Sequence, residues 1–195
     1  ASSKNFPIDK SSAMLSFNFG GGAKGEGEGE KDVDYTKYEE GIYVGYRWFD
    51  SQKMNVSYPF GYGLSYTTFE YSNAAVKAEG ENITVTVDVK NTGAVDGKEI
   101  VELYAVAPAG NMDKPAQELK AFAKTKALKP GETATVTLKF NAADLASFDE
   151  DQNAWVVDAG TYTLKVGASS RDIKAELTTE VAAKTTPVSK GFAKK

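Results

Sequence analysis

The chain's candidates for chemistry are carboxylates, because its 195 residues contain neither histidine nor cysteine. Mechanisms that need a Ser-His-Asp or Cys-His arrangement are therefore excluded, as are zinc sites with thiolate ligands. Glu39, Glu40 and Asp50 stand among aromatic residues, where an apolar setting can raise a carboxyl pKa and suit acid/base chemistry. The alternative, which we favour, is structural: Glu40 and Asp50 pair with Arg47.

The stretch that holds these carboxylates is rich in aromatic residues. Residues 35–71 contain twelve of the chain's 22 aromatic side chains. Aromatic faces can stack on sugar rings, but Tyr and Trp also pack between domains with their polar tips hydrogen-bonded. We favour the second role for most of them. The candidate contacts between domains or at a substrate entrance are Glu40, Tyr46, Arg47, Trp48 and Asp50.

After this stretch the pattern becomes that of short strands. Ile83, Val85, Val87 and Val89 alternate with polar residues, which is the period of a strand with one buried face. Similar patterns predict about seven strands, near residues 69–77, 83–90, 101–106, 117–124, 134–140, 162–166 and 173–181. Seven short strands without a long helix predict a mainly β fold, an immunoglobulin-like antiparallel β-sandwich.

Turn and cap signals separate these strands. Asn91-Thr92-Gly93 predicts a turn, and the Pro130-Gly131 pair suits a type II turn. Asn141 and Asp144 predict one capped helical turn between the fifth and sixth strands.

Composition shifts after residue 34 and again near residue 69, and residues 184–195 form a polar last part. The first part includes a Gly/Glu-rich run at residues 19–30, which we interpret as an exposed loop; a phosphate cradle and a calcium site fit its pattern less well. The last part predicts a polar, solvated tail. A net charge of −4 argues against nucleic acid, and no apolar run is long enough for a membrane span.

Two stretches resemble a known family. Residues 38–50, YEEGIYVGYRWFD, and residues 58–69, YPFGYGLSYTTF, resemble the closing segment of the second domain of glycoside hydrolase family 3, the β-glucosidase family. Residues 87–173 are similar to the fibronectin type III-like domain of many members, with landmarks such as VKNTG at 89–93 and VGASS at 166–170. The resemblance implies that residues 1–65 are the C-terminal remnant of an α/β sandwich domain, that residues 66–183 are the fibronectin type III-like β-sandwich, and that residues 184–195 are a polar tail.

The resemblance implies a parent enzyme, an exo-acting β-glycosidase of β-glucosidase type that hydrolyses terminal β-linked sugars with retention. Such chemistry uses two carboxyls about 5–5.5 Å apart. In the family the nucleophile Asp and the acid/base Glu are expected upstream of this chain, so no catalytic residue is assigned here. The resemblance implies no metal or organic cofactor and a periplasmic or extracellular location.

The expected partner of this portion is the N-terminal catalytic portion of the same enzyme. The β-linked oligosaccharide substrate is bound by the parent enzyme as a whole, not by this portion alone. This portion would scaffold the catalytic domains and be inactive alone, and its polar loop at residues 107–115 could shape the active-site entrance. A free-standing β-sandwich module that binds carbohydrate or protein is the alternative. An independent hydrolase using the carboxylates of this chain is a third hypothesis.

Overall fold

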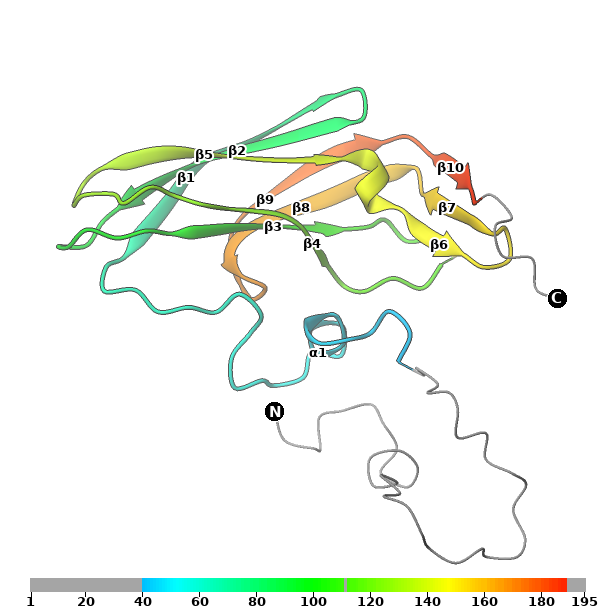
Figure 1. Cartoon of the computed structure of the whole chain (residues 1–195), viewed down its shortest axis with the longest axis horizontal. Helices are drawn as coiled ribbons and strands as arrows, with labels where there is room; N and C mark the ends of the chain where they lie inside the picture. Colours follow the sequence, from blue (N-terminus) through cyan, green and yellow to red (C-terminus); the bar gives the residue numbers. More distant parts are fainter. Residues whose placement is uncertain (1–39, 111, 189–195) are drawn as a thin grey trace, which may run out of the picture.

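The computed structural model describes residues 40–110 and 112–188. The expected loop at residues 19–30, Glu39 and most of the expected first domain lie outside these residues. The described part is a β-sandwich preceded by one short helix (Figure 1). The helices and strands are α1 (Tyr46–Ser51), β1 (Phe69–Glu79), β2 (Asn82–Asn91), β3 (Ile100–Val106), β4 (Glu118–Lys124), β5 (Thr133–Asn141), the 3-10 helix η2 (Ala142–Leu145), β6 (Ser147–Asp149), β7 (Ala154–Val157), β8 (Gly160–Ser169), β9 (Asp172–Val181) and β10 (Lys184–Pro187).

The two main sheets have the strand orders β1-β2-β5 and β4-β3-β8-β9, with every neighbouring pair antiparallel. These seven strands are those that the sequence predicts, so the mainly β fold and the sandwich are confirmed. Apolar residues of alternate positions meet between the sheets. The fully buried ones include Val85, Val87 and Val89 of β2, Val101 and Leu103 of β3, and Leu164 and Val166 of β8.

Local signals set the ends of these strands. The N–H of Glu132 donates to the Lys129 carbonyl at 2.9 Å, and Gly131 has φ of 78°, as a type II turn requires. Asn141 caps η2 by accepting from the Ala143 N–H, and Asp144 accepts from the Asn141 N–H, which completes a capping box. Both signals were predicted from the sequence.

A third small sheet, of order β10-β7-β6, was missed. Strands β6 and β7 have three and four residues, too few to show a period of two. Strand β10 lies in the expected polar tail, and its residues 184–187 pair with β7 instead of standing free in solvent. The side chains of these four residues are all exposed, so this part of the expected polar tail is a paired strand at the surface, and residues 189–195 lie outside the described residues.

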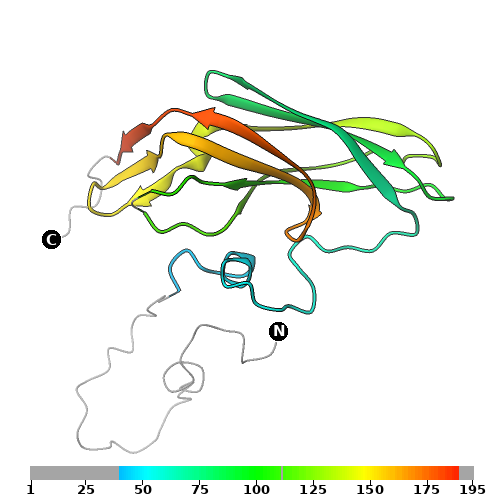
Figure 2. The same cartoon turned by 180° about the vertical axis from the view of Figure 1, so that it is seen from behind.

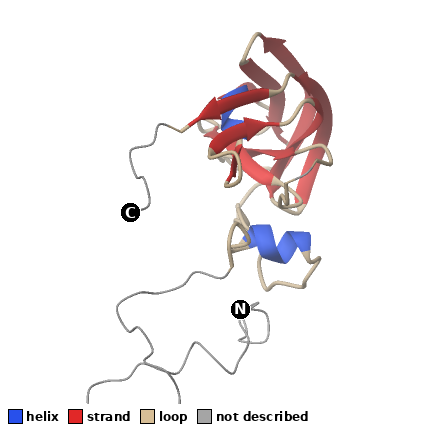
Figure 3. Cartoon of the chain, turned by 90° about the vertical axis from the view of Figure 1, so that its right-hand side faces the viewer, coloured by secondary structure: helices blue, strands red, loops and turns tan. Residues whose placement is uncertain are grey.

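The chain before β1 crosses the outer side of the four-stranded sheet. Helix α1 lies outside both layers (Figure 3), and the turn between β8 and β9 reaches towards it when the molecule is seen from behind (Figure 2). We call residues 40–66 the docked segment. Most of the candidate site residues lie in this segment, beside the four-stranded sheet.

Candidate functional site

The docked segment covers the outer face of β3. Alternation along β3 points Val101 and Leu103 into the core and Glu102 and Tyr104 outwards, yet only 7% of Glu102 and none of Tyr104 is exposed. The ring of Tyr46 meets Tyr104 edge-on, with centroids 6.0 Å apart. The alternation predicts one solvent-exposed face for β3, but both of its faces are buried, as an interface between two layers requires.

Glu102 is the buried carboxylate of this interface. Its Oε2 accepts a 2.5 Å hydrogen bond from the Tyr104 hydroxyl. Burial raises the pKa of Glu102 above its ordinary value, the tyrosine hydrogen bond acts the opposite way, and the charge of Glu99 raises it further. Gly61 packs directly on this carboxylate, since a Cβ at Gly61 would lie 2.2 Å from Glu102 Oε2.

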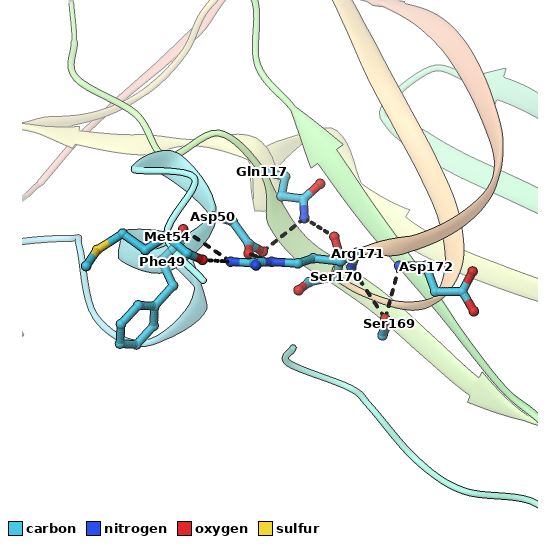
Figure 4. A network of polar contacts seen from close by, with 8 residues as sticks. All are labelled: Phe49, Asp50, Met54, Gln117, Ser169, Ser170, Arg171 and Asp172. Carbon is cyan, nitrogen blue, oxygen red and sulfur yellow. Dashed lines mark hydrogen bonds and ion pairs between the residues drawn. The ribbon is translucent and has the colours of Figure 1, made fainter. Parts of the chain in front are cut away.

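Arg171, in the turn between β8 and β9, holds the C-terminal end of α1 (Figure 4). Its Nε donates to Asp50 Oδ1 at 2.7 Å, and its Nη2 donates to the carbonyls of Met54 at 2.7 Å and Phe49 at 3.3 Å. A helix end leaves carbonyls without intrahelical partners and carries partial negative charge. One guanidinium therefore satisfies a carboxylate and the helix end together.

Gln117 extends this network into the sandwich. Its Nε2 donates to the Ser170 carbonyl at 2.7 Å and lies 3.3 Å from Asp50 Oδ2. Because Asp50 is engaged by Arg171 and Gln117, its carboxylate is committed to structure. This arrangement does not suit a catalytic acid.

A second set of contacts joins α1 to the start of β4. Arg47 pairs with Glu118 at 3.3 Å, and the backbone N–H of Leu119 donates to the Tyr46 hydroxyl at 2.8 Å. The Ser51 hydroxyl accepts from the Ala116 N–H at 2.9 Å.

The expected pairing of Arg47 with Glu40 or Asp50 is therefore wrong. Both acidic residues are close to Arg47 in sequence, but the sheet offers a carboxylate from a distant strand. Glu40 lies half-buried at the start of the docked segment, where its carbonyl accepts from the Tyr43 N–H at 3.1 Å.

The loop between β3 and β4 is held from both sides. The Tyr43 hydroxyl donates to Asp113 Oδ1 at 2.5 Å, and this bond, with smaller effects of burial and charge, raises the pKa of Tyr43 to about 12. Lys114 pairs with Asp158 at 2.5 Å, and its side chain is largely buried. The loop that the sequence predicts as polar is thus fastened to the docked segment and to the sandwich.

Trp48 contributes a half-buried ring and an unsatisfied donor. Its Nε1 is buried and has no hydrogen-bond partner among the residues that the structure describes. The ring meets Tyr43 edge-on with centroids 5.9 Å apart. Buried indole N–H groups usually find an acceptor.

Seven large apolar residues of the docked segment are exposed. The large apolar residues exposed there are Ile42, Val44, Tyr58, Phe60, Tyr62, Leu64 and Tyr66. A cavity of about 590 Å³ opens among Tyr46, Phe49, Asp50, Tyr58 and Phe60. So many exposed apolar side chains in one short segment are typical of a region that contacts another protein surface.

Sequence reasoning missed Arg171, Gln117, Glu118 and Glu102 as interface residues. One signal could have found Arg171: the chain has only two arginines, and both lie in this interface. Among the described residues no group of acidic side chains could hold a metal ion. No helix of the described part is long and apolar enough to cross a membrane.

A family model of the fibronectin type III-like domain matches residues 99–170. The chain is 43% identical over 148 residues to a β-glucosidase, BoGH3A, of Bacteroides ovatus, covering 74% of this chain and 20% of the relative. It is 45% identical over 140 residues to an exo-α-(1→6)-L-arabinopyranosidase of Bifidobacterium longum, covering 71% and 18%.

The chain also resembles the solved structure of β-glucosidase 3B from Thermotoga neapolitana in complex with glucose. The TM-score is 0.75 and the identity 50%, over 77% of this chain and 21% of that one. The chain therefore spans about a fifth of the length of these relatives.

Proposed function

The chain carries the C-terminal portion of a glycoside hydrolase family 3 protein, and from this premise we propose that its parent is a retaining, exo-acting β-glycosidase of β-glucosidase type. Retaining hydrolysis needs a nucleophilic and a proton-donating carboxyl about 5–5.5 Å apart. In the described residues Asp50 is held by Arg171, and Glu102 is buried beneath Gly61. The family resemblance supports placing both carboxyls of the catalytic pair in the rest of the parent, and these two contacts agree with that proposal.

We propose that this portion scaffolds the catalytic domains. The observation that carries this proposal is the dual character of the docked segment. The segment is fastened to the sandwich by Arg47, Asp50 and their partners, and it also exposes seven large apolar residues. The buried Nε1 of Trp48 also calls for an acceptor beyond the described residues. Both features suit a segment that ends one domain and packs against the next. The domain boundary then lies near residue 66.

The loop at residues 107–115 is our candidate for shaping the active-site entrance. Tyr43 and Asp158 hold Asp113 and Lys114 in place. These two contacts would keep residues 113 and 114 in one position relative to the docked segment and the sandwich. Deletion of residues 108–114 in the parent should change substrate preference or rate. An unchanged parent would rule out this role.

The experiment that tests the proposed function compares two purified proteins on p-nitrophenyl β-glucoside. The 195-residue chain should give no turnover above the buffer rate, and the parent that contains it should hydrolyse the substrate. A parent enzyme that ends just before residue 40 of this chain, and therefore lacks the docked segment and the sandwich, should lose activity at least a hundredfold if this portion is a scaffold. Turnover by the 195-residue chain that survives repurification would overturn the proposal, and variants of Glu39, Glu40 and Asp50 would then locate its source.

The same comparison separates the free-standing binding module from the scaffold. Such a module should stay monomeric and fully folded without the parent. The scaffold should self-associate through its exposed apolar residues or gain protection there when the upstream portion is added. Hydrogen exchange at residues 42–66, measured with and without that portion, distinguishes the two outcomes.

A further inference from the structure

The small sheet of β6, β7 and β10 carries an exposed aromatic row. Phe148 pairs with Trp155 across β6 and β7, and Trp155 pairs with Thr186 across β7 and β10. Directly paired residues place their side chains on the same face of a sheet. Phe148 is 41% and Trp155 49% exposed. We call these three residues the aromatic row; Figure 1 shows its sheet at the right-hand end of the sandwich, while α1 lies beneath the middle.

Contacts within the small sheet hold the two rings of the row in place. The rings of Phe148 and Trp155 meet edge-on, with centroids 5.4 Å apart and planes at 64°. Asp149 closes the turn that follows β6 by accepting from the N–H groups of Asp151 and Gln152 at 3.0 Å. A fixed ring loses little conformational entropy on binding, which favours affinity.

A depression of about 370 Å³ lies beside Trp155, between η2 and β10. Its polar lining comes from Asp144, Lys184 and Thr186. The two charges there already have partners: Lys184 pairs with Glu81, and Asp144 accepts from the Asn141 N–H at 2.8 Å. A charged ligand would therefore gain little.

The groups that a ligand can contact here are the aromatic face of Trp155 and, around it, the Thr186 hydroxyl, the Lys184 ammonium and the Asp144 carboxylate. A carboxylate has two oxygens and several acceptor sites, so Asp144 can accept from a hydroxyl in addition to its backbone bond. A β-linked glucose ring matches this arrangement, since its equatorial hydroxyls lie around the rim and its two faces present C–H groups. The depression lies within the range of small-ligand sites, about 300–1,000 Å³.

We propose that the aromatic row is a non-catalytic binding site for a neutral β-linked glucan chain. The site goes beyond the proposed function, because it uses none of the docked segment and needs no catalytic carboxyl. Trp155 stacks on one sugar ring, Phe148 fixes the indole, and Thr186 and Asp144 contact the hydroxyls. A protein partner fits less well, because stable protein interfaces bury about 800 Å² per partner, far more than two half-exposed rings offer.

Affinity electrophoresis of the 195-residue chain tests the proposal, with barley mixed-linkage β-glucan or laminarin in the gel and dextran, an α-linked glucan, as the comparison. The β-glucans should retard the chain and dextran should not. Trp155→Ala should weaken the apparent affinity at least tenfold. Phe122→Ala is the matched control, since Phe122 is 70% exposed on β4, and it should migrate as the unchanged chain does.

Thermal unfolding of each variant checks that the small sheet persists. If Trp155→Ala does not fold, Trp155→Leu keeps an apolar side chain without an aromatic face and should also lose binding. The proposal is overturned if no β-glucan retards the chain, or if Trp155→Ala and Trp155→Leu bind as Phe122→Ala does. Self-association that Trp155→Ala abolishes would assign the row to a second copy, and this also overturns it. No catalytic activity enters the measurement, so its outcome is independent of the parent's function.

Discussion

Arg171 and Asp50 are 121 positions apart in the chain, and the guanidinium Nε of one lies 2.7 Å from the carboxylate of the other. Only 9% of the Asp50 side chain is exposed. The pair joins the helix of the docked segment to a turn of the sandwich (Figure 4). Its position makes it the contact on which the joint between the two parts most depends.

Arg171→Ala should loosen this joint. The change removes the charged donor of the Asp50 carboxylate, which keeps its 3.3 Å contact with Gln117, and the side-chain donor of the Met54 carbonyl. Hydrogen bonds to charged groups are each worth about 1.5–3 kcal/mol. We expect a loss of about 2 kcal/mol in the free energy of unfolding and faster proteolysis within residues 46–54. Lys77→Ala is the control, because Lys77 forms an exposed pair with Glu79, and it should change stability by less than about 0.5 kcal/mol. Equal effects of the two substitutions would contradict the role given to Arg171.

Gly61→Ala should destabilise the chain through the buried carboxylate. The φ of Gly61 is 82°, and an added Cβ would collide with Glu102 Oε2. Positive φ alone costs a side chain about 1–2 kcal/mol, so we expect a loss of at least about 2 kcal/mol in chemical denaturation. Gly63→Ala is the matched glycine, since a Cβ there would meet nothing within 4 Å. A nearly neutral Gly61→Ala would show that the docked segment does not press on β3.

Glu102 should make the stability depend on pH in an unusual direction. Because burial raises its pKa in the folded chain, the folded state holds this proton to higher pH than the unfolded state. Its contribution is therefore complete below the ordinary value of 4.5 and is lost as the pH rises through the folded pKa. Burial also raises the pKa of Glu99, which adds in the same direction.

Glu102→Gln keeps an acceptor for the Tyr104 hydroxyl and removes the titration. The variant should gain stability relative to the unchanged chain between pH 4.5 and pH 7, as measured by urea unfolding at several pH values. Glu176→Gln, at an exposed position of β9, should leave the slope as it is. A parallel pH profile for Glu102→Gln and the unchanged chain would refute the assignment.

Asn91→Ala should cost about 2–4 kcal/mol of stability. The side chain is fully buried, accepts from the Thr67 hydroxyl at 2.6 Å and the Gly93 N–H at 3.0 Å, and donates to the carbonyls of Val95 and Leu128 at 2.8 Å. Its removal leaves buried polar groups unpaired, each costing about 1–3 kcal/mol. Asn82→Ala, at the exposed start of β2, is the control for thermal unfolding. A small effect at Asn91 would mean that water replaces its side chain.

The sequence by itself determined the sandwich. Alternation over 83–89 and similar patterns in the other six long strands are local, because a strand places successive side chains on opposite faces whatever it pairs with. The turn at Pro130-Gly131 and the cap at Asn141 are equally local, since each depends on a few adjacent residues. Strands β6, β7 and β10 are too short or too polar to show such a pattern.

Only the tertiary structure decided how the candidate residues are used. Alternation marks Glu102 and Tyr104 as outward-facing, but the docked segment buries them. Proximity in sequence suggests Arg47 as the partner of Asp50, but each finds its partner on a distant strand or turn. The choice of partner depends on which groups the packing brings within hydrogen-bond distance. Contacts across 70 to 120 positions are made by the assembled sheets, and no local spacing encodes them.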